Sequence, residues 1–407
     1  MTGRAAGSAG AGGLAITGGT VVTLDPPGVG RRDVLLGVEP RRELDASGCL
    51  VMPGLTIAHT HLYFALARGM PGPAEPPRSF REILEKVWWR LDTALDEKSL
   101  EASAELALLD AALSGVTAVI DHHESPSFIA GSLGVLARAA RAVGVRAALC
   151  YGATDRNGAK GAREGLAECA RAIRDGLPAM VGLHAGFTVS DETLGVAVDL
   201  AKRTAAWLHV HAAEDRCDAG SFGRLEKAGA LGPKTILAHG VHLSPEERAR
   251  VRGTAAWIVH NPRSNLQNAV GYADPKTLGP RVALGTDGMD ADLFTEARVA
   301  HLRAREAYGP AEGIDAVALL VNSGRLADLA LGKRPGDWIV LDYDPPTPVS
   351  AANLAGHVLF GLGTRHVRDV VVNGEVVVRG RRSVRVDAAR IRARAREEAV
   401  RLWRRMA

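Results

Sequence analysis

Two histidines one residue apart, His59 and His61, end an apolar run that begins at Met52. Side chains of a strand alternate between its two faces, so these two imidazoles are expected to point the same way. Two imidazoles at the end of one strand supply two-thirds of a three-ligand metal site. The alternative is a polar strand end with two chance histidines, so the metal hypothesis depends on further ligands elsewhere in the chain.

Residues that can bind a metal or move a proton recur at the ends of later apolar runs. The run-ending residues are His61, His122, His184, His211, His239, His260 and Asp287. The runs are short and apolar, and cover residues 51–57, 116–121, 146–151, 180–184, 207–211, 235–239, 257–260 and 282–287. Helical patterns separate most of them, for example over 101–113, 132–143 and 192–203. Eight strands alternating with helices predict an α/β fold, a (β/α)₈ TIM-like barrel.

In such a barrel the C-terminal ends of the strands form the mouth where active sites lie. We therefore predict a metal site built from His59, His61, His211 and Asp287. Three imidazoles and one carboxylate suit a single divalent ion, with Zn²⁺ expected and Fe²⁺ the alternative, and leave a position for water. A metal ion held in this way lowers the pKa of its water to about 7.

Two further residues are expected to move protons beside that ion. Glu214 lies three residues after His211, and as a carboxylic acid it is predicted to protonate a ring nitrogen and help to expel ammonia. Its structural alternative is a carboxylate at a helix N-terminus. His239 is expected to orient the water and polarise developing charge, whereas His209 is expected to be packed and hydrogen-bonded, not a ligand.

Five motifs together resemble the amidohydrolase superfamily, in particular its chlorohydrolase and aminohydrolase group, which includes guanine and S-adenosylhomocysteine deaminases. The motifs are His59-Thr60-His61, His211-Ala212-Ala213-Glu214, His239-Gly240-Val241-His242, His260-Asn261-Pro262-Arg263-Ser264-Asn265 and Gly285-Thr286-Asp287-Gly288. Blocks at 88–92, 121–126, 344–348 and 356–361 are similar to the SsnA-like aminohydrolases. In that group the gene often accompanies selenium-dependent molybdenum hydroxylases of purine metabolism.

The resemblance implies a mononuclear site with the four ligands named above and with Glu214 and His239 as catalytic residues. The fourth strand offers His184 and no lysine, which favours one metal over two. His184 matches a position that contacts substrate in related deaminases, and we expect His122, Trp88 and Asn265 to contact substrate as well. Core packing is the alternative for Trp88. A homodimer is the expectation drawn from the group.

The leading functional hypothesis is hydrolytic deamination of an amino-substituted nitrogen heterocycle that is purine-like, pterin-like or pyrimidine-like. The alternative is hydrolysis of a cyclic amide or imidazolone C–N bond on the same scaffold. A third hypothesis, a non-catalytic assembly protein, predicts missing ligands, and all four are present in this sequence.

Strand patterns at both ends of the chain flank the barrel region. They cover 14–24, which is expected to form a hairpin-like pair, then 33–38, 337–342 and 367–378, which contains an Asn-Gly turn. These patterns predict a small β-sandwich domain built from residues 1–50 and 336–407, the latter ending in a helix, with the barrel over 51–335.

Charge and cysteine usage restrict the partners. The segment 379–407 holds eleven arginines and three acidic residues, which gives 11 − 3 = +8, whereas the net charge of the whole chain is +4. A basic tail can bind nucleic acid or a membrane surface, but its stripe of apolar residues favours a solvated amphipathic helix.

Four scattered cysteines without a CxxC pair predict reduced thiols. The small, Gly- and Ala-rich residues 1–13 predict a frayed tail and no signal peptide, so we expect a cytoplasmic protein.

Overall fold

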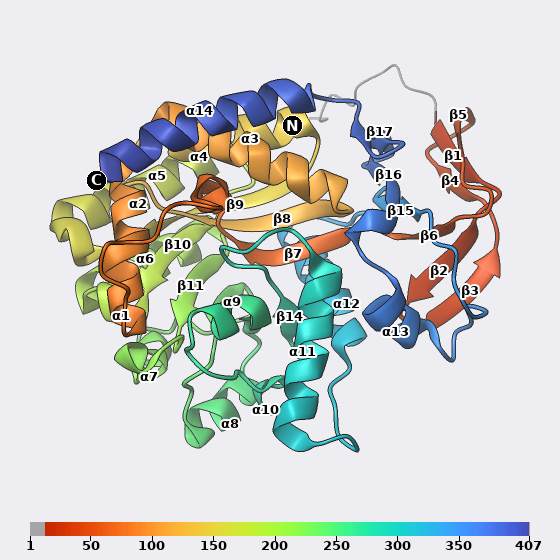
Figure 1. Cartoon of the computed structure of the whole chain (residues 1–407). Helices are drawn as coiled ribbons and strands as arrows, with labels where there is room; N and C mark the ends of the chain where they lie inside the picture. Colours follow the sequence, from red (N-terminus) through yellow and green to blue (C-terminus); the bar gives the residue numbers. More distant parts are fainter. Residues whose placement is uncertain (1–12, 407) are drawn as a thin grey trace, which may run out of the picture.

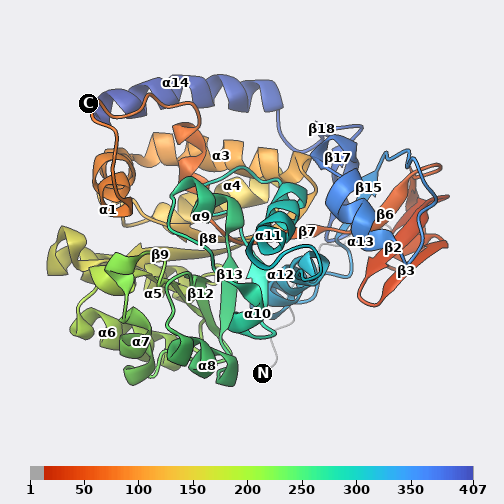
Figure 2. The ribbon, with the colours of Figure 1, turned by 60° about the horizontal axis from the view of Figure 1, so that its bottom comes forward.

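The computed structural model describes residues 13–406, so the frayed tail expected at residues 1–13 lies, except for Gly13, outside the described residues. Eight parallel strands follow one another in sequence order across a single sheet, and helices cover its outer face (Figures 1 and 2). The strands are β7 (Leu55–Thr60), β8 (Val116–His123), β9 (Arg146–Ala153), β10 (Val181–Ala185), β11 (Leu208–Ala212), β12 (Thr235–His239), β13 (Trp257–His260) and β14 (Val282–Leu284). The predicted barrel is confirmed.

The barrel closes between its first strand and the segment that follows its last. Thr60 forms a parallel bridge with Asp287, and the backbone N–H groups of Thr286 and Asp287 donate to the carbonyl of His59 at 2.9 and 3.0 Å. β14 therefore ends at Leu284, three residues before the expected strand end, because residues 285–287 turn across to β7.

The helices alternate with these strands as the sequence predicts. The longer ones are α3 (Glu97–Leu113), α4 (Ser132–Val143), α5 (Gly158–Arg174), α6 (Asp191–Thr204), α8 (Pro245–Gly253), α11 (Leu293–Tyr308) and α12 (Ala316–Leu331). Local sequence fixes several starts: Asp96 and Ser99 form a reciprocal capping box on α3, and Ser244 and Glu247 do so on α8. The insertion after the first barrel strand folds into η1 (Leu62–Ala67), α1 (Phe80–Ile83), η2 (Leu84–Trp88) and α2 (Trp89–Ala94).

Strands from both chain ends form two further sheets beside the barrel, as the predicted β-sandwich requires (Figure 1). One sheet has the order β4-β1-β5 and the other the order β18-β17-β16-β15-β6-β2-β3. Their N-terminal strands are β1 (Gly13–Thr17), β2 (Thr20–Leu24), β3 (Pro27–Arg31), β4 (Val34–Leu36), β5 (Pro40–Asp45) and β6 (Leu50–Pro53). Their C-terminal strands are β15 (Trp338–Leu341), β16 (Val367–Val372), β17 (Glu375–Arg379) and β18 (Arg382–Ser383).

Two details differ from the sequence predictions. β1 and β2 do not form a hairpin-like pair, because Gly18 takes a left-handed φ of +69° and the Thr20 N–H donates to Cys49, which places β2 in the other sheet. The run 51–57 is two strands, because the Gly54 N–H donates to Asp337 and separates β6, in the seven-stranded sheet, from β7, in the barrel. The Asn-Gly hairpin is confirmed: Asn373 and Gly374 join β16 to β17 with φ values of 51° and 78°.

The basic C-terminal helix α14 (Ala388–Met406) lies along α3 and contacts α2 and η1 (Figure 1). Its apolar stripe is buried, and its arginines reach acidic partners of the barrel: Arg392 contacts Asp110 at 2.8 Å and Arg405 contacts Asp96 at 3.2 Å. Much of the basic charge is thus balanced within the chain. Among residues 13–406, no helix combines the length and apolar character needed to cross a bilayer.

Leu402 lies on the buried face of α14 and is fully buried, whereas Arg404 on the same helix is exposed. Leu402→Ala should reduce the free energy of unfolding by about 2–5 kcal/mol, because it leaves a cavity under the helix. The control Arg404→Ala should stay within about 0.5 kcal/mol of the parent chain. Urea unfolding followed by circular dichroism checks both, and equal stability of the two variants would show that the helix does not depend on this packing.

Candidate active site

Four side chains from three places in the barrel meet at the C-terminal end of its strands. They are His59 of β7, His61 directly after β7, His211 of β11 and Asp287 after β14, and one ligand atom of each lies within 4.8 Å of those of the others. The Nε2 atom of His61 is 2.9 Å from Asp287 Oδ1, and that of His59 is 3.5 Å from the same oxygen. The structure therefore brings together the four residues that the sequence predicts as metal ligands.

The imidazoles are held so that their Nε2 atoms face one another. His61 Nδ1 is 2.6 Å from the carbonyl oxygen of His122, and His211 Nδ1 is 2.6 Å from that of His184. An N–H donated to a backbone carbonyl fixes the tautomer and leaves Nε2 to bind a metal, as is usual for ligating histidines. His59 Nδ1 is instead 2.9 Å from Nε2 of His209, which agrees with the prediction that His209 is hydrogen-bonded.

The electrostatics of the cluster fit a cation. Burial lowers the pKa of His59 to about 4 and that of His211 well below its usual value, so both are neutral imidazoles. Burial opposes ionisation of Asp287, yet the neighbouring His59 and His61 hold its pKa well below the usual value. His59 Nε2 is buried and makes no hydrogen bond to a described residue. Burial opposes protonation of His61, but the hydrogen bond to Asp287 and its charge raise the pKa of this histidine to about 9, so a metal ion bound there takes the place of a proton. Neutral imidazole nitrogens and an ionised carboxylate are the donor set of a divalent metal such as Zn²⁺.

Three residues of the site have backbone conformations that side-chain-bearing residues seldom adopt. Ala213, His239 and Asp287 have φ values of 51°, 79° and 52°, a left-handed region that costs about 1–3 kcal/mol per residue. Hydrogen bonds retain this geometry: the His242 N–H donates to Ala213 at 2.7 Å, and Asp287 donates to the carbonyl of His59. Such local strain is concentrated at functional sites.

Glu214 and His239 lie next to the ligand cluster. A carboxylate oxygen of Glu214, a ring nitrogen of His239 and an oxygen of Asp287 lie within 4.8 Å of one another, and Glu214 Oε2 is 3.6 Å from His239 Nε2. Burial raises the pKa of Glu214 well above its usual value, and the nearby charge of Asp287 raises it further. Glu214 is therefore suited to hold a proton near neutral pH.

His239 is oriented by an amide. Its Nδ1 lies 2.9 Å from Oδ1 of Asn265, which accepts the ring proton and leaves the Nε2 lone pair directed at the site. Burial lowers the pKa of His239, so the ring is neutral and able to accept a proton. Asn265 thus acts on His239 and is absent from the residues that line the cavities of the site.

A cavity of about 50 Å³ extends from the metal cluster between aromatic side chains. Its walls include the residues Tyr63, Phe64, Phe80, Trp88, Trp89 and Phe187. Trp88 stacks on Phe64 with ring centroids 4.3 Å apart, and the His184 ring lies next to His211 with centroids 5.5 Å apart. The expected contacts Trp88 and His184 therefore line the cavity. His122 does not: its ring is fully buried inside the barrel, where Nε2 is 3.0 Å from the carbonyl oxygen of Leu183.

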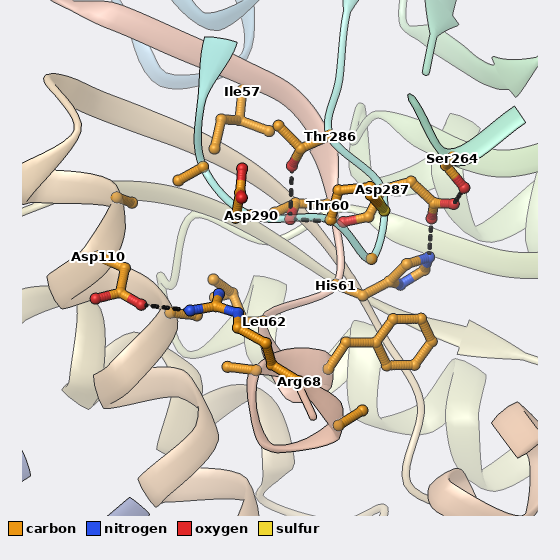
Figure 3. A pocket seen from close by; sticks show the side chains of 18 of the residues that line it. Ile57, Thr60, His61, Leu62, Arg68, Asp110, Ser264, Thr286, Asp287 and Asp290 are labelled. Atoms are coloured by element: carbon orange, nitrogen blue, oxygen red, sulfur yellow. Dashed lines mark hydrogen bonds and ion pairs between the residues drawn. The ribbon is translucent and has the colours of Figure 1, made fainter. Parts of the chain in front are cut away.

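A second hollow of about 430 Å³ adjoins this cavity (Figure 3). In this view His61 points at the Asp287 carboxylate, which also accepts a hydrogen bond from the Ser264 hydroxyl, while Arg68 reaches Asp110. Both spaces touch His61, Phe64 and Asp287. A Cβ on Gly288 would lie 2.4 Å from the Phe64 ring, so this position must remain glycine for the ring to sit here.

The sequence did not point to several residues of the site. Ser264 orients the Asp287 carboxylate, and Asp92, Glu124 and Arg156 form a buried charged group beside the small cavity. The only sequence signal for Ser264 and Glu124 was their place in motifs at the ends of barrel strands. Asp92 lies on α2 and Arg156 follows β9, so no local pattern connects them.

Comparison with known proteins identifies the same scaffold. Residues 50–377 match the profile of the amidohydrolase family. The 5-methylthioadenosine/S-adenosylhomocysteine deaminase of Pelotomaculum thermopropionicum is 30% identical, over 96% of this chain and 93% of that protein.

Solved structures with bound zinc share the fold. An adenosine deaminase from Xanthomonas campestris has a TM-score of 0.81 at 22% identity, covering 96% of this chain and 98% of its own. The atrazine chlorohydrolase TrzN from Arthrobacter aurescens has a TM-score of 0.80 at 22% identity, covering 95% and 100% of the two chains.

Asp287→Ala should lower zinc affinity by more than the roughly 10–100-fold that losing an outer partner of a metal site costs. The control His260→Gln, which alters a buried histidine outside the cluster, should keep the parent affinity. Zinc binding to the metal-stripped proteins, followed by competition with a chromogenic chelator, gives both values. Unchanged affinity in Asp287→Ala would exclude this carboxylate as a ligand.

Proposed function

The chain belongs to the amidohydrolase family and is a hydrolase of carbon–nitrogen bonds other than peptide bonds; we propose that it is a metal-dependent aminohydrolase that releases ammonia from an amino-substituted nitrogen heterocycle. The observation that carries the proposal is the placing of Glu214 and His239 beside the four-ligand cluster, with 3.6 Å between their facing atoms. Deamination needs a proton donor for a ring nitrogen and then for the leaving amine, and this pair supplies it.

The residues that would hold the ion are His59, His61, His211 and Asp287, whose geometry and protonation fit a single divalent metal. When bound, such an ion makes water a usable nucleophile at neutral pH. We propose Zn²⁺, because the donor set suits it and zinc is present in the two similar structures.

The side chains then account for the proton movements. Water adds to the ring carbon that bears the amino group, and the electron pair of the C=N bond moves to the ring nitrogen. The Glu214 carboxyl gives its proton to that nitrogen, and His239, neutral at Nε2, takes one of the two protons of the attacking water. Glu214 recovers a proton from the added hydroxyl and passes it to the amine. The C–N bond breaks, a carbonyl forms and ammonia leaves. After ammonia has left, the proton from water passes from His239 to the facing Glu214 carboxylate and restores both residues.

The aromatic walls support a flat substrate. Trp88 and Phe64 stack and form one side of the cavity, and aromatic faces of this kind favour planar heterocycles. The deaminase relatives support the same reaction class on a purine ring. We propose purine-like, pterin-like or pyrimidine-like substrates, with the reaction centre on the edge that faces Glu214.

The proposal is tested by an ammonia-release screen of the zinc-loaded enzyme over aminated purines, their nucleosides, pterins and pyrimidines. At least one compound should release ammonia with its ring intact. A ring-opened carboxylate product in mass spectrometry would instead support hydrolysis of a cyclic amide and contradict deamination.

On the substrate so found, Glu214→Gln should lower kcat by about 10²–10⁴-fold, because the amide cannot deliver a proton. Its zinc content should equal that of the parent enzyme, since Glu214 is outside the four-ligand set. The variant Glu168→Gln, a buried glutamate paired with Arg171 away from the cavity, serves as the control and should keep the parent kcat. A Glu214→Gln enzyme with parental kcat would remove Glu214 from the reaction.

A further inference from the structure

The cavity has a second polar group beside the metal cluster, reached through His184, whose ring centroid is 5.5 Å from that of His211. Asp92 of α2 and Glu124, directly after β8, line the cavity together with His184. Arg156, from the turn after β9, lies behind the two acids. All three charged side chains are at least nine-tenths buried, with exposed fractions of 3%, 2% and 10% for Asp92, Glu124 and Arg156. Buried charges are costly, so their arrangement requires a reason.

Arg156 does not satisfy both carboxylates. Its Nη2 atom alone contacts Asp92 Oδ2 and Glu124 Oε2, each at 2.7 Å, whereas a guanidinium usually engages a carboxylate through two nitrogens. One guanidinium also balances only one of the two negative charges. The remaining oxygen of Glu124 faces His184 Nε2 at 3.4 Å.

Three polar atoms of this group are buried without a hydrogen bond to any described residue: Asp92 Oδ1, Trp89 Nε1 and Arg156 Nη1. Asp92 and Trp89 line the cavity whereas Arg156 does not, so Asp92 Oδ1 is the unpaired acceptor that faces a ligand there. Buried polar atoms are nearly always paired in folded proteins, and exceptions mark sites where something else binds. The Trp89 ring is itself fixed between two guanidinium groups, with Arg81 at 4.6 Å and Arg156 at 4.7 Å from its centroid.

The raised pKa values of the two acids agree with a site that takes a cation. Burial raises the pKa of Glu124 to about 8, against the opposing effect of Arg156, and raises the pKa of Asp92 as well. Two ionised carboxylates are therefore unfavourable here with Arg156 as the one cation in contact with them among the described residues. A ligand that brings positive charge or several N–H donors would allow both to ionise and would supply partners for Asp92 Oδ1 and Glu124 Oε1.

We propose that Asp92 and Glu124 form a subsite for a positively charged or amino-rich edge of the substrate, of the amidine type N–C–N, on the side of the ring away from the reacting carbon. The subsite selects cationic or donor-rich heterocycles and disfavours substrates that present a carboxylate or phosphate there. This inference rests on the proposed function in taking the small cavity as the substrate site. Arg156 is a positioning residue that holds the two carboxylates and Trp89 in place.

Three flat compounds of matched shape test the subsite without turnover: benzamidine, a cation; benzamide, which is neutral; and benzoate, an anion. Binding to the zinc-loaded enzyme is measured by isothermal titration calorimetry. Benzamidine should bind most tightly and benzoate most weakly. Benzamidine binding that is absent, or no tighter than that of benzoate, would overturn the proposal.

Variants test whether the preference for a cation comes from Asp92 and Glu124. Glu124→Gln and Asp92→Asn should each weaken benzamidine binding by about tenfold or more, the range for losing a charge-assisted hydrogen bond, with benzamide little affected. Asp92→Asn provides the result if Glu124→Gln does not fold. The control Glu168→Gln, a buried Glu–Arg pair of the same kind elsewhere, should bind benzamidine as the parent does. Parental benzamidine affinity in a folded Glu124→Gln or Asp92→Asn enzyme would overturn the proposal.

The two proposals fail separately. If no compound in the ammonia screen reacts but the order of binding and its loss in the variants hold, the deaminase assignment fails and the cation subsite stands. If ammonia is released but benzamidine affinity is the same in the parent and in both variants, only the subsite is lost.

Discussion

The closure of the barrel is the contact on which the site depends. The His59 carbonyl accepts hydrogen bonds from both Thr286 and Asp287, so the first strand and the segment after the last are joined at the rim. That join carries Asp287 to the imidazoles of His59 and His61, which lie almost 230 residues earlier in the chain. A shift at this join would move the carboxylate away from every nitrogen it faces. The strained φ of Asp287 is explained by the same two hydrogen bonds.

The cavity that starts from this join has two parts with different chemistry. One part holds three imidazoles, an ionised Asp287 and a protonated Glu214, and is suited to hydrolysis. The other holds two carboxylates with one guanidinium between them. Aromatic rings join the two parts, so a flat molecule that reaches from one to the other is fixed in both plane and direction. The family scaffold accounts for the first part, whereas the second arises from side chains on three separate segments of this chain.

Much of the site could be predicted from the sequence, because it depends on the alternation of side chains along a strand and on which residues end the barrel strands. Alternation along β7 puts His59 and His61 on one face, and parallel strands bring their last residues to one rim, where His211, His239 and Asp287 were expected. Whether a side chain near a strand end faces the cavity or the barrel interior was harder to predict. His122 ends an apolar run like the others, but its side chain faces the barrel interior under the cluster. Asn265 was expected to contact substrate, but it accepts a hydrogen bond from His239 and does not line the cavity. Asp92 and Arg156 belong to segments far apart in sequence, and only the folded chain brings them together. The split of the run 51–57 at Gly54 was missed because an apolar stretch does not show which sheet each half joins.

The central claim is that three imidazoles and one carboxylate of this chain share a single ion. X-ray absorption spectroscopy at the zinc edge of the protein loaded with one equivalent of zinc tests it most directly. The account predicts three imidazole nitrogens with the remaining ligands oxygen, and one imidazole fewer in a His211→Ala protein. A spectrum with sulfur ligands, or one that His211→Ala leaves unchanged, would contradict it.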